Sequence, residues 1–150
     1  MIIAVDFDGT CVTHEYPNVG KDIGAAPVLK WLVEQGHQII LWTMRGGTGI
    51  ANPAEPDKFN KYDLQDAIEW FDKNDIPLIG VNTNPTQGSW TSSPKAYANI
   101  YIDDAALGCP LKIVKALSDR PFVNWELVRV QLEEIFNSKA VIGHTTLVER

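Results

Sequence analysis

The sequence has few cysteines and no long apolar run. Cys11 and Cys109 are its only cysteines among 150 residues, which fits a reducing compartment better than a disulfide framework. Two cysteines also cannot form a zinc site from thiolates alone. No apolar stretch approaches the roughly 20 residues of a transmembrane helix, and the N-terminus lacks a secretory signal pattern. We therefore expect no membrane association and a cytoplasmic location.

Positive charge is also scarce. The chain has 13 Lys and Arg against 19 Asp and Glu, a formal net charge of −6. A nucleic-acid partner is not expected, because a phosphate backbone calls for a basic face on the protein. A small anionic substrate is compatible with this composition, since the local charge of a site can oppose the total.

The apolar pattern predicts a single domain, residues 1–150, in which strands alternate with helices. Strands are expected at 2–5, 38–43, 76–82 and 98–104, and the helices are expected before Gly36, at 57–73 and from Trp125 to Phe136. Residues 111–117 are expected to form a short helix, and 121–125 to contain a short strand. This alternation is typical of an α/β protein, here a three-layer α/β/α Rossmann-like fold with a mostly parallel sheet.

Carboxylates follow two of the predicted strands. Asp6 and Asp8 come directly after the first strand, and Asp103 and Asp104 end the fourth. In parallel sheets, ligands bind beyond the carboxyl ends of the strands. Carboxylates gathered there would oppose folding unless a cation lay among them. Mg²⁺, which prefers oxygen ligands, would remove this conflict.

Such a site can carry out phosphoryl transfer. One carboxylate can attack phosphorus, and a second can protonate the leaving oxygen and later activate water. A hydroxyl group and a lysine would hold the remaining phosphoryl oxygens, and Thr43 and Lys95 are available. Arg45 could bind a substrate phosphate or carboxylate, and a surface ion pair is an equal alternative.

Four segments in order resemble the motifs of the haloacid dehalogenase (HAD) superfamily: "DFDGT" at 6–10, "IILWT" ending in Thr43, Lys95, and "IYIDD" ending in Asp104. The resemblance covers residues 2 to about 109. It implies a phosphatase, a phosphomonoester hydrolase that acts through an aspartyl-phosphate with Mg²⁺. It also implies the following roles: Asp6 as nucleophile, Asp8 as general acid and base and as a metal ligand through its carbonyl, Thr43 as phosphate ligand, Lys95 as stabilising cation, and Asp103 as metal ligand with Asp104 in support.

Other features of this resemblance leave alternatives open. Only seven residues separate Lys95 from Asp103, so Lys58 and Lys61 are alternatives for the active-site lysine. The chain has no room for a large cap domain and resembles the capless branch, whose open sites accept bulky substrates or are covered by another subunit. Homo-oligomerisation is therefore open, and the tail at 138–150 could be flexible, an edge strand or an arm that contacts a subunit.

Several other interpretations compete with this one. "DG" is also a common turn signal, and the EF-hand calcium loop fails because Cys11 and Pro17 occupy the positions of its Gly and Glu. A binding or regulatory module for phosphorylated ligands on the same fold is the main functional alternative, and a receiver-like signalling domain is another. His14 is expected at most to line the rim of the site, and both cysteines are expected to be packing residues.

Overall fold

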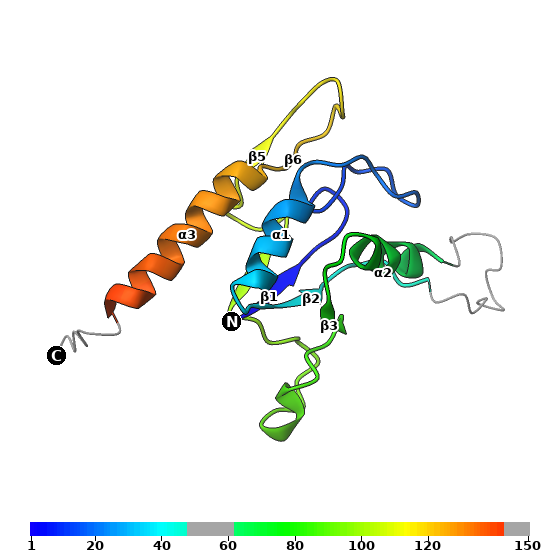
Figure 1. Cartoon of the computed structure of the whole chain (residues 1–150). Coiled ribbons are helices and arrows are strands. Elements are labelled where there is room, and N and C mark those ends of the chain that lie inside the picture. Colours follow the sequence, from blue (N-terminus) through cyan, green and yellow to red (C-terminus); the bar gives the residue numbers. More distant parts are fainter. Residues whose placement is uncertain (48–61, 143–150) are drawn as a thin grey trace.

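The structure is a computed structural model and describes residues 1–47 and 62–142, without the side chains of 139–142 (Figure 1). Its main elements follow the predicted alternation. The helices and strands are β1 (Ile2–Val5), α1 (Ala25–Glu34), β2 (Gln38–Leu41), α2 (Asp63–Lys73), β3 (Leu78–Val81), the 3-10 helix η1 (Gln87–Ser89), β4 (Ile100–Ile102), β5 (Leu111–Lys112), β6 (Phe122–Val123) and α3 (Trp125–Ile142).

The central sheet has four parallel strands in the order β3-β2-β1-β4. Ala4 in the middle of β1 lies opposite Ile40 of β2 and Tyr101 of β4. This register brings the ends of β1 and β4 side by side, although almost 100 residues separate the two strands. The α/β, Rossmann-like fold class predicted from the sequence is confirmed.

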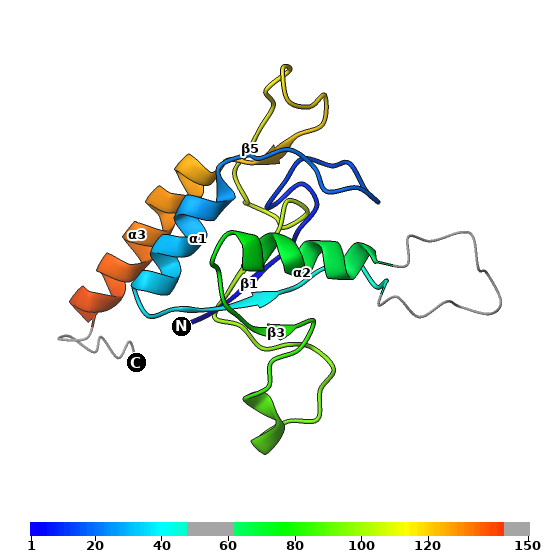
Figure 2. The same cartoon turned by 45° about the vertical axis from the view of Figure 1, so that its right-hand side comes forward.

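The two faces of the sheet are covered differently. Alternate residues Ile3, Val5, Ile39 and Leu41 belong to a core cluster that includes buried residues of α1, α2 and α3. On the opposite face, Ala4 and Ile40 cluster with Ala98, and no helical residue of the described chain joins them. Figures 1 and 2 show the segment between β3 and β4 on this side. The second covering layer is thus a loop with one 3-10 turn instead of the expected helices.

Chain direction explains this arrangement. The connections from β1 to β2 and from β2 to β3 move across the sheet in one direction, through α1 and α2. The connection from β3 to β4 moves back in the other direction. Since crossovers between parallel strands keep one hand, a return movement must pass over the opposite face.

Two sequence predictions differ from the structure, and a third is described only in part. Residues 111–117 do not form a helix, because Leu111–Lys112 pairs with Phe122–Val123 in an antiparallel ladder. Burial of Phe122 and Val123 outweighs helix formation in a segment too short to be stable as a helix. The edge strand considered for the tail is wrong for 138–142, which continue α3, and 143–150 lie outside the described residues. The predicted helix at 57–73 is present as α2 from Asp63 to Lys73, and residues 57–61 lie outside the described residues.

Two predicted helix ends are confirmed. Gly36 follows α1 with φ of +81°, and the N–H groups of Gly36 and His37 donate to the carbonyls of Val33 and Leu32. This is the closing pattern that favours glycine. At the start of α3, Asn124 Oδ1 accepts from the N–H of Leu127 at 3.4 Å, as expected of a capping residue.

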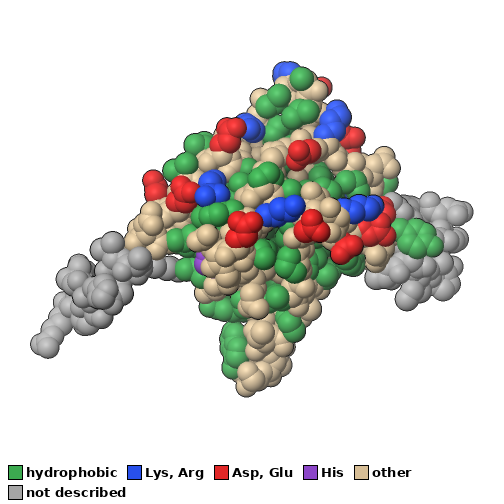
Figure 3. All heavy atoms as spheres, viewed as in Figure 1, with side chains coloured by type: hydrophobic (Ala, Val, Ile, Leu, Met, Phe, Trp, Pro, Cys, Tyr) green, Lys and Arg blue, Asp and Glu red, His purple; other side chains and the backbone are tan. Residues whose placement is uncertain are grey.

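The surface mixes charges of both signs. Figure 3 shows acidic and basic side chains interspersed on one face of the molecule. Ion pairs of the described residues include Lys115–Asp119 and Arg129–Glu133, each four positions apart. None of the helices in the described ranges is both long and apolar enough to cross a membrane.

Candidate functional site

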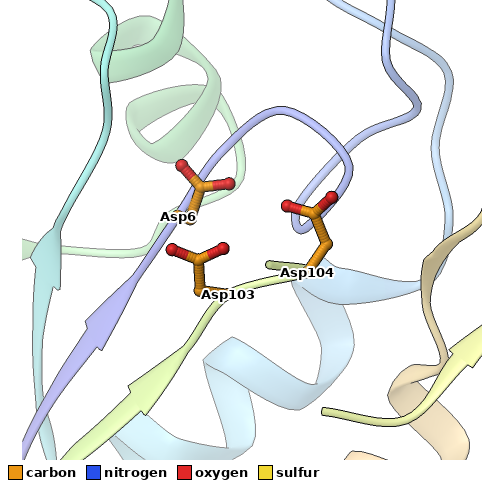
Figure 4. Close-up of side chains that lie close together, drawn as sticks. All are labelled: Asp6, Asp103 and Asp104. Atoms are coloured by element: carbon orange, nitrogen blue, oxygen red, sulfur yellow. The ribbon is translucent and has the colours of Figure 1, made fainter. Parts of the chain in front are cut away.

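Three carboxylates meet at the carboxyl ends of β1 and β4. Asp6 follows β1, Asp103 and Asp104 follow β4, and one oxygen from each lies within 4.8 Å of the others. Figure 4 shows the three groups around a common space. The Asp6 N–H donates to the carbonyl of Ile102 at 3.0 Å, which fixes the two strand ends together. The donor set consists of carboxylate oxygens, the ligands that suit Mg²⁺.

The electrostatics of Asp6 also favour a cation. The pKa of Asp6 is raised from 3.8 to about 7, mainly by burial. The charges of Asp103 and Asp104 contribute to this increase, and the hydrogen bonds from the Phe7 N–H and from Thr10 oppose it. In the described part of the chain, no Lys or Arg forms an ion pair with Asp6 or Asp103. The protein therefore holds a carboxylate that ionises at neutral pH only with difficulty unless positive charge is supplied.

The turn after β1 connects the acidic groups to each other and to α3. Thr10 is fully buried, its hydroxyl donates to Asp6 Oδ2 at 3.1 Å, and it accepts from the Asp104 N–H at 3.0 Å. The Trp125 indole N–H donates to the Thr10 carbonyl at 2.6 Å. Thr10 thus bridges the two strand ends while α3 holds the turn in place. From the sequence, Thr10 was only the end of a motif, because its partners Asp104 and Trp125 lie 94 and 115 positions away.

Asp8 lies outside the carboxylate cluster and is paired with Arg45. Both Asp8 oxygens accept from Arg45, from Nε and from Nη2, each at 2.7 Å. Arg45 is 2% exposed, and its other N–H groups donate to the carbonyls of Pro17, Asn18 and Asp63. All five N–H groups of the guanidinium are therefore occupied. In this arrangement Arg45 holds the Asp8 carboxylate in position and has no N–H left for a substrate phosphate.

Replacing Arg45 by lysine is expected to lower the free energy of unfolding by about 2 kcal/mol, because an ammonium group keeps the charge but leaves buried carbonyl oxygens without donors. Urea denaturation would measure the change. The matched control is Arg120→Lys, at an exposed position, where we expect almost no effect. Equal stability of the two variants would contradict a role for Arg45 in holding Asp8 and the neighbouring carbonyl groups in position.

Thr43 lies just beyond β2, next to the β1 end. Its N–H donates to Asn82 Oδ1 at 2.8 Å, and its Oγ1 accepts from the Arg45 N–H at 3.2 Å. Among the described residues, the hydroxyl hydrogen of Thr43 has no acceptor, so it is available to a ligand. The position agrees with the predicted phosphate contact, which stays a prediction.

Lys95 lies in the segment between β3 and β4 and is not part of the carboxylate cluster. Its Nζ is 5.5 Å from the centre of the Tyr101 ring. Tyr101 belongs to β4, and Asp103 follows the end of that strand. Lys95 thus contacts β4 close to the site, and no ion pair joins it to Asp103 within the described ranges. Lys58 and Lys61 lie outside the described residues, so the choice among the three lysines stays a prediction.

His14 and the cysteines have different relations to the acidic groups. His14 Nε2 lies 2.9 Å from Asp104 Oδ2, a direct contact that the sequence did not indicate. Burial raises the pKa of the Cys11 thiol well above its usual value, and Asp6 and Asp8 add to the effect. Burial likewise raises the pKa of Cys109, with Asp103 and Asp104 nearby. Both thiols therefore stay protonated, which agrees with the expected packing role.

This chain is similar to a protein of solved structure. No family model matches the chain, and no curated protein matches it at a significant level. Among solved structures, the chain is similar to a conserved protein from Bacteroides thetaiotaomicron, with 30% sequence identity and a TM-score of 0.65 over 89% of this chain and 90% of the other. At this identity and coverage, the chain belongs to the same family as that conserved protein, whose name states no activity.

Proposed function

We propose that the protein is a magnesium-dependent phosphomonoester hydrolase that acts through an aspartyl-phosphate intermediate on Asp6. The observation that carries the proposal is the convergence of Asp6, Asp103 and Asp104 within 4.8 Å at adjacent strand ends, with Asp6 raised to a pKa of about 7, mainly by burial. Such a cluster is suited to a divalent cation and to an anionic phosphate bound beside it. The resemblance of the four segments to HAD phosphatases supports the same activity.

Asp6, Asp103 and Asp104 would hold Mg²⁺, which would neutralise charge that develops on the phosphoryl oxygens. The carbonyl of Asp8 is the further ligand implied by the resemblance. Thr43, with its available hydroxyl hydrogen, would donate to a phosphoryl oxygen, and Lys95 would have to turn from Tyr101 towards the bound phosphate.

The reaction would take place in two steps. In the first, an Asp6 oxygen forms a bond to phosphorus, the bond from phosphorus to the leaving oxygen breaks, and Asp8 donates a proton to that oxygen. In the second, water attacks phosphorus and gives a proton to Asp8, while the Asp6 oxygen leaves as a carboxylate. Arg45 occupies one lone pair on each Asp8 oxygen, so a lone pair remains on each for the proton.

One observation favours a second candidate, a module that binds phosphorylated ligands with little turnover. Both Asp8 oxygens make 2.7 Å hydrogen bonds to a buried guanidinium, and proton transfer through Asp8 must compete with them. A protein that only binds its ligand needs no such transfer. Measurement of binding and turnover on the same sample separates the two candidates.

The direct test is a panel of phosphate monoesters, including p-nitrophenyl phosphate, assayed with Mg²⁺ at about 5 to 10 mM or with EDTA at about the same concentration. This Mg²⁺ concentration is chosen to exceed the Kd of a weak Mg²⁺ site. We expect phosphate release with Mg²⁺ and none with EDTA. Binding of phosphorylated compounds without release would support the second candidate. Absence of both across the panel, with any divalent cation, would exclude both functions.

A further inference from the structure

His14 is tied to the carboxylate cluster through one of its members. His14 Nε2 lies 2.9 Å from Asp104 Oδ2, and the side chains of His14 and Asp104 are only 15% and 20% exposed. The Asp104 N–H donates to Thr10 Oγ1 at 3.0 Å. Asp104 is therefore held at its backbone by Thr10 and at its carboxylate by His14, and both contacts come from the turn that follows β1.

The local chain makes room for the His14 ring. A Cβ atom at Gly9 would overlap Nε2 of this ring, so any other residue at that position would displace the ring from its place. Gly9 also has a φ of +80°, a conformation that glycine adopts without strain. The turn is fixed further by hydrogen bonds from the Gly9 N–H to the Val12 carbonyl and from the Val123 N–H to the Gly9 carbonyl.

We infer that His14 is a positioning residue for the metal site: it holds the Asp104 carboxylate in the orientation that faces Asp6 and Asp103. This inference rests on the proposed magnesium site. Without His14, the Asp104 carboxylate would keep only the long 3.5 Å contact with the Thr10 hydroxyl. Its side chain would then rotate among several staggered conformations, and few of them would aim an oxygen at the common space in Figure 4. Hydrogen bonds to metal-binding carboxylates fix such orientations in other metal sites.

The test is a titration of the full chain with Mg²⁺ alone, in which calorimetry measures the Kd. It is carried out for the unaltered protein and for three variants. His14→Phe keeps a ring but has no donor, and His14→Asn has an amide too short to reach Asp104. We expect both to raise the Kd for Mg²⁺ about 10-fold or more. His14→Gln is the matched control, because its amide N–H reaches the position of Nε2, and we expect a change of less than about 3-fold.

A double-mutant cycle that combines the His14 variants with Asp104→Asn shows whether His14 acts through Asp104. In that background, His14→Phe should change the Kd by less than about 2-fold, because the carboxylate that His14 orients is gone. Thermal unfolding confirms that each variant is folded. Should His14→Phe and His14→Asn bind Mg²⁺ as tightly as the unaltered protein, or should the effect persist in full without Asp104, the inference is overturned.

The outcome for His14 is distinguishable from the outcome for the proposed function. Mg²⁺ binding that depends on His14, in a protein that hydrolyses no phosphate ester, would support the positioning role and exclude the phosphatase activity. Hydrolysis that needs Mg²⁺ but tolerates every His14 variant without a change in Kd would support the activity and exclude the role. An unaltered protein that binds no Mg²⁺ would overturn both.

Discussion

Asp6→Asn is expected to lower kcat for p-nitrophenyl phosphate by about 10⁴-fold or more, the scale at which loss of a nucleophile acts in other hydrolases. The amide has nearly the same shape as the carboxylate but cannot form the aspartyl-phosphate. The Thr10 hydroxyl can still donate to the remaining carbonyl oxygen, so the turn should keep its structure. Steady-state kinetics with saturating Mg²⁺ measures the loss.

A covalent label distinguishes a nucleophile from a simple metal ligand. Rapid acid quenching of the unaltered protein with labelled substrate should leave phosphate on the peptide that contains Asp6, and Asp6→Asn should leave none. Asp119→Asn, at an exposed position where the carboxylate pairs with Lys115, is the control and should keep full activity. Retention of activity in Asp6→Asn would contradict the assigned role.

The stability of the metal-free protein should fall as the pH rises from about 4 to about 7. The Asp6 pKa is about 7 in the folded protein against 3.8 for the ordinary group, so the native state binds more protons than the unfolded state within this window. Stability then decreases with pH. Because one pKa unit corresponds to about 1.4 kcal/mol, ionised Asp6 lowers the free energy of unfolding by an amount on the order of 4 kcal/mol above pH 7.

Urea denaturation in EDTA at pH 5 and pH 8 measures this effect. We expect Asp6→Asn to be more stable than the unaltered protein at pH 8 and similar to it at pH 5, since the amide has no proton to lose. Mg²⁺ should stabilise the unaltered protein more at pH 8 than at pH 5, by binding only the folded state. Equal stability of the two proteins at both pH values would contradict the raised pKa of Asp6.

Much of the architecture was predictable because it depends on local spacing. The helical spacing before Gly36 and the capping residue Asn124 act through contacts within a few residues of each other. The apolar run at Ile2–Val5 is recognisable as a buried strand from its own composition, although its partner strands are distant in the sequence. The rule for the carboxyl ends of parallel strands also placed Asp6 near Asp103. The helix predicted at 111–117 was wrong, because the conformation of this segment depends on a partner strand about ten residues further on.

The sequence by itself determined the α/β alternation and the residue types at the strand ends, since backbone periodicity and turn chemistry are local. Only the tertiary structure decided what those residues contact. Arg45 meets Asp8 across 37 positions, His14 meets Asp104 across 90, and Trp125 meets Thr10 across 115. Such pairs form only once the strand order, the register and the packing of α3 are set, and these arise from the burial of the whole core, which no short segment encodes.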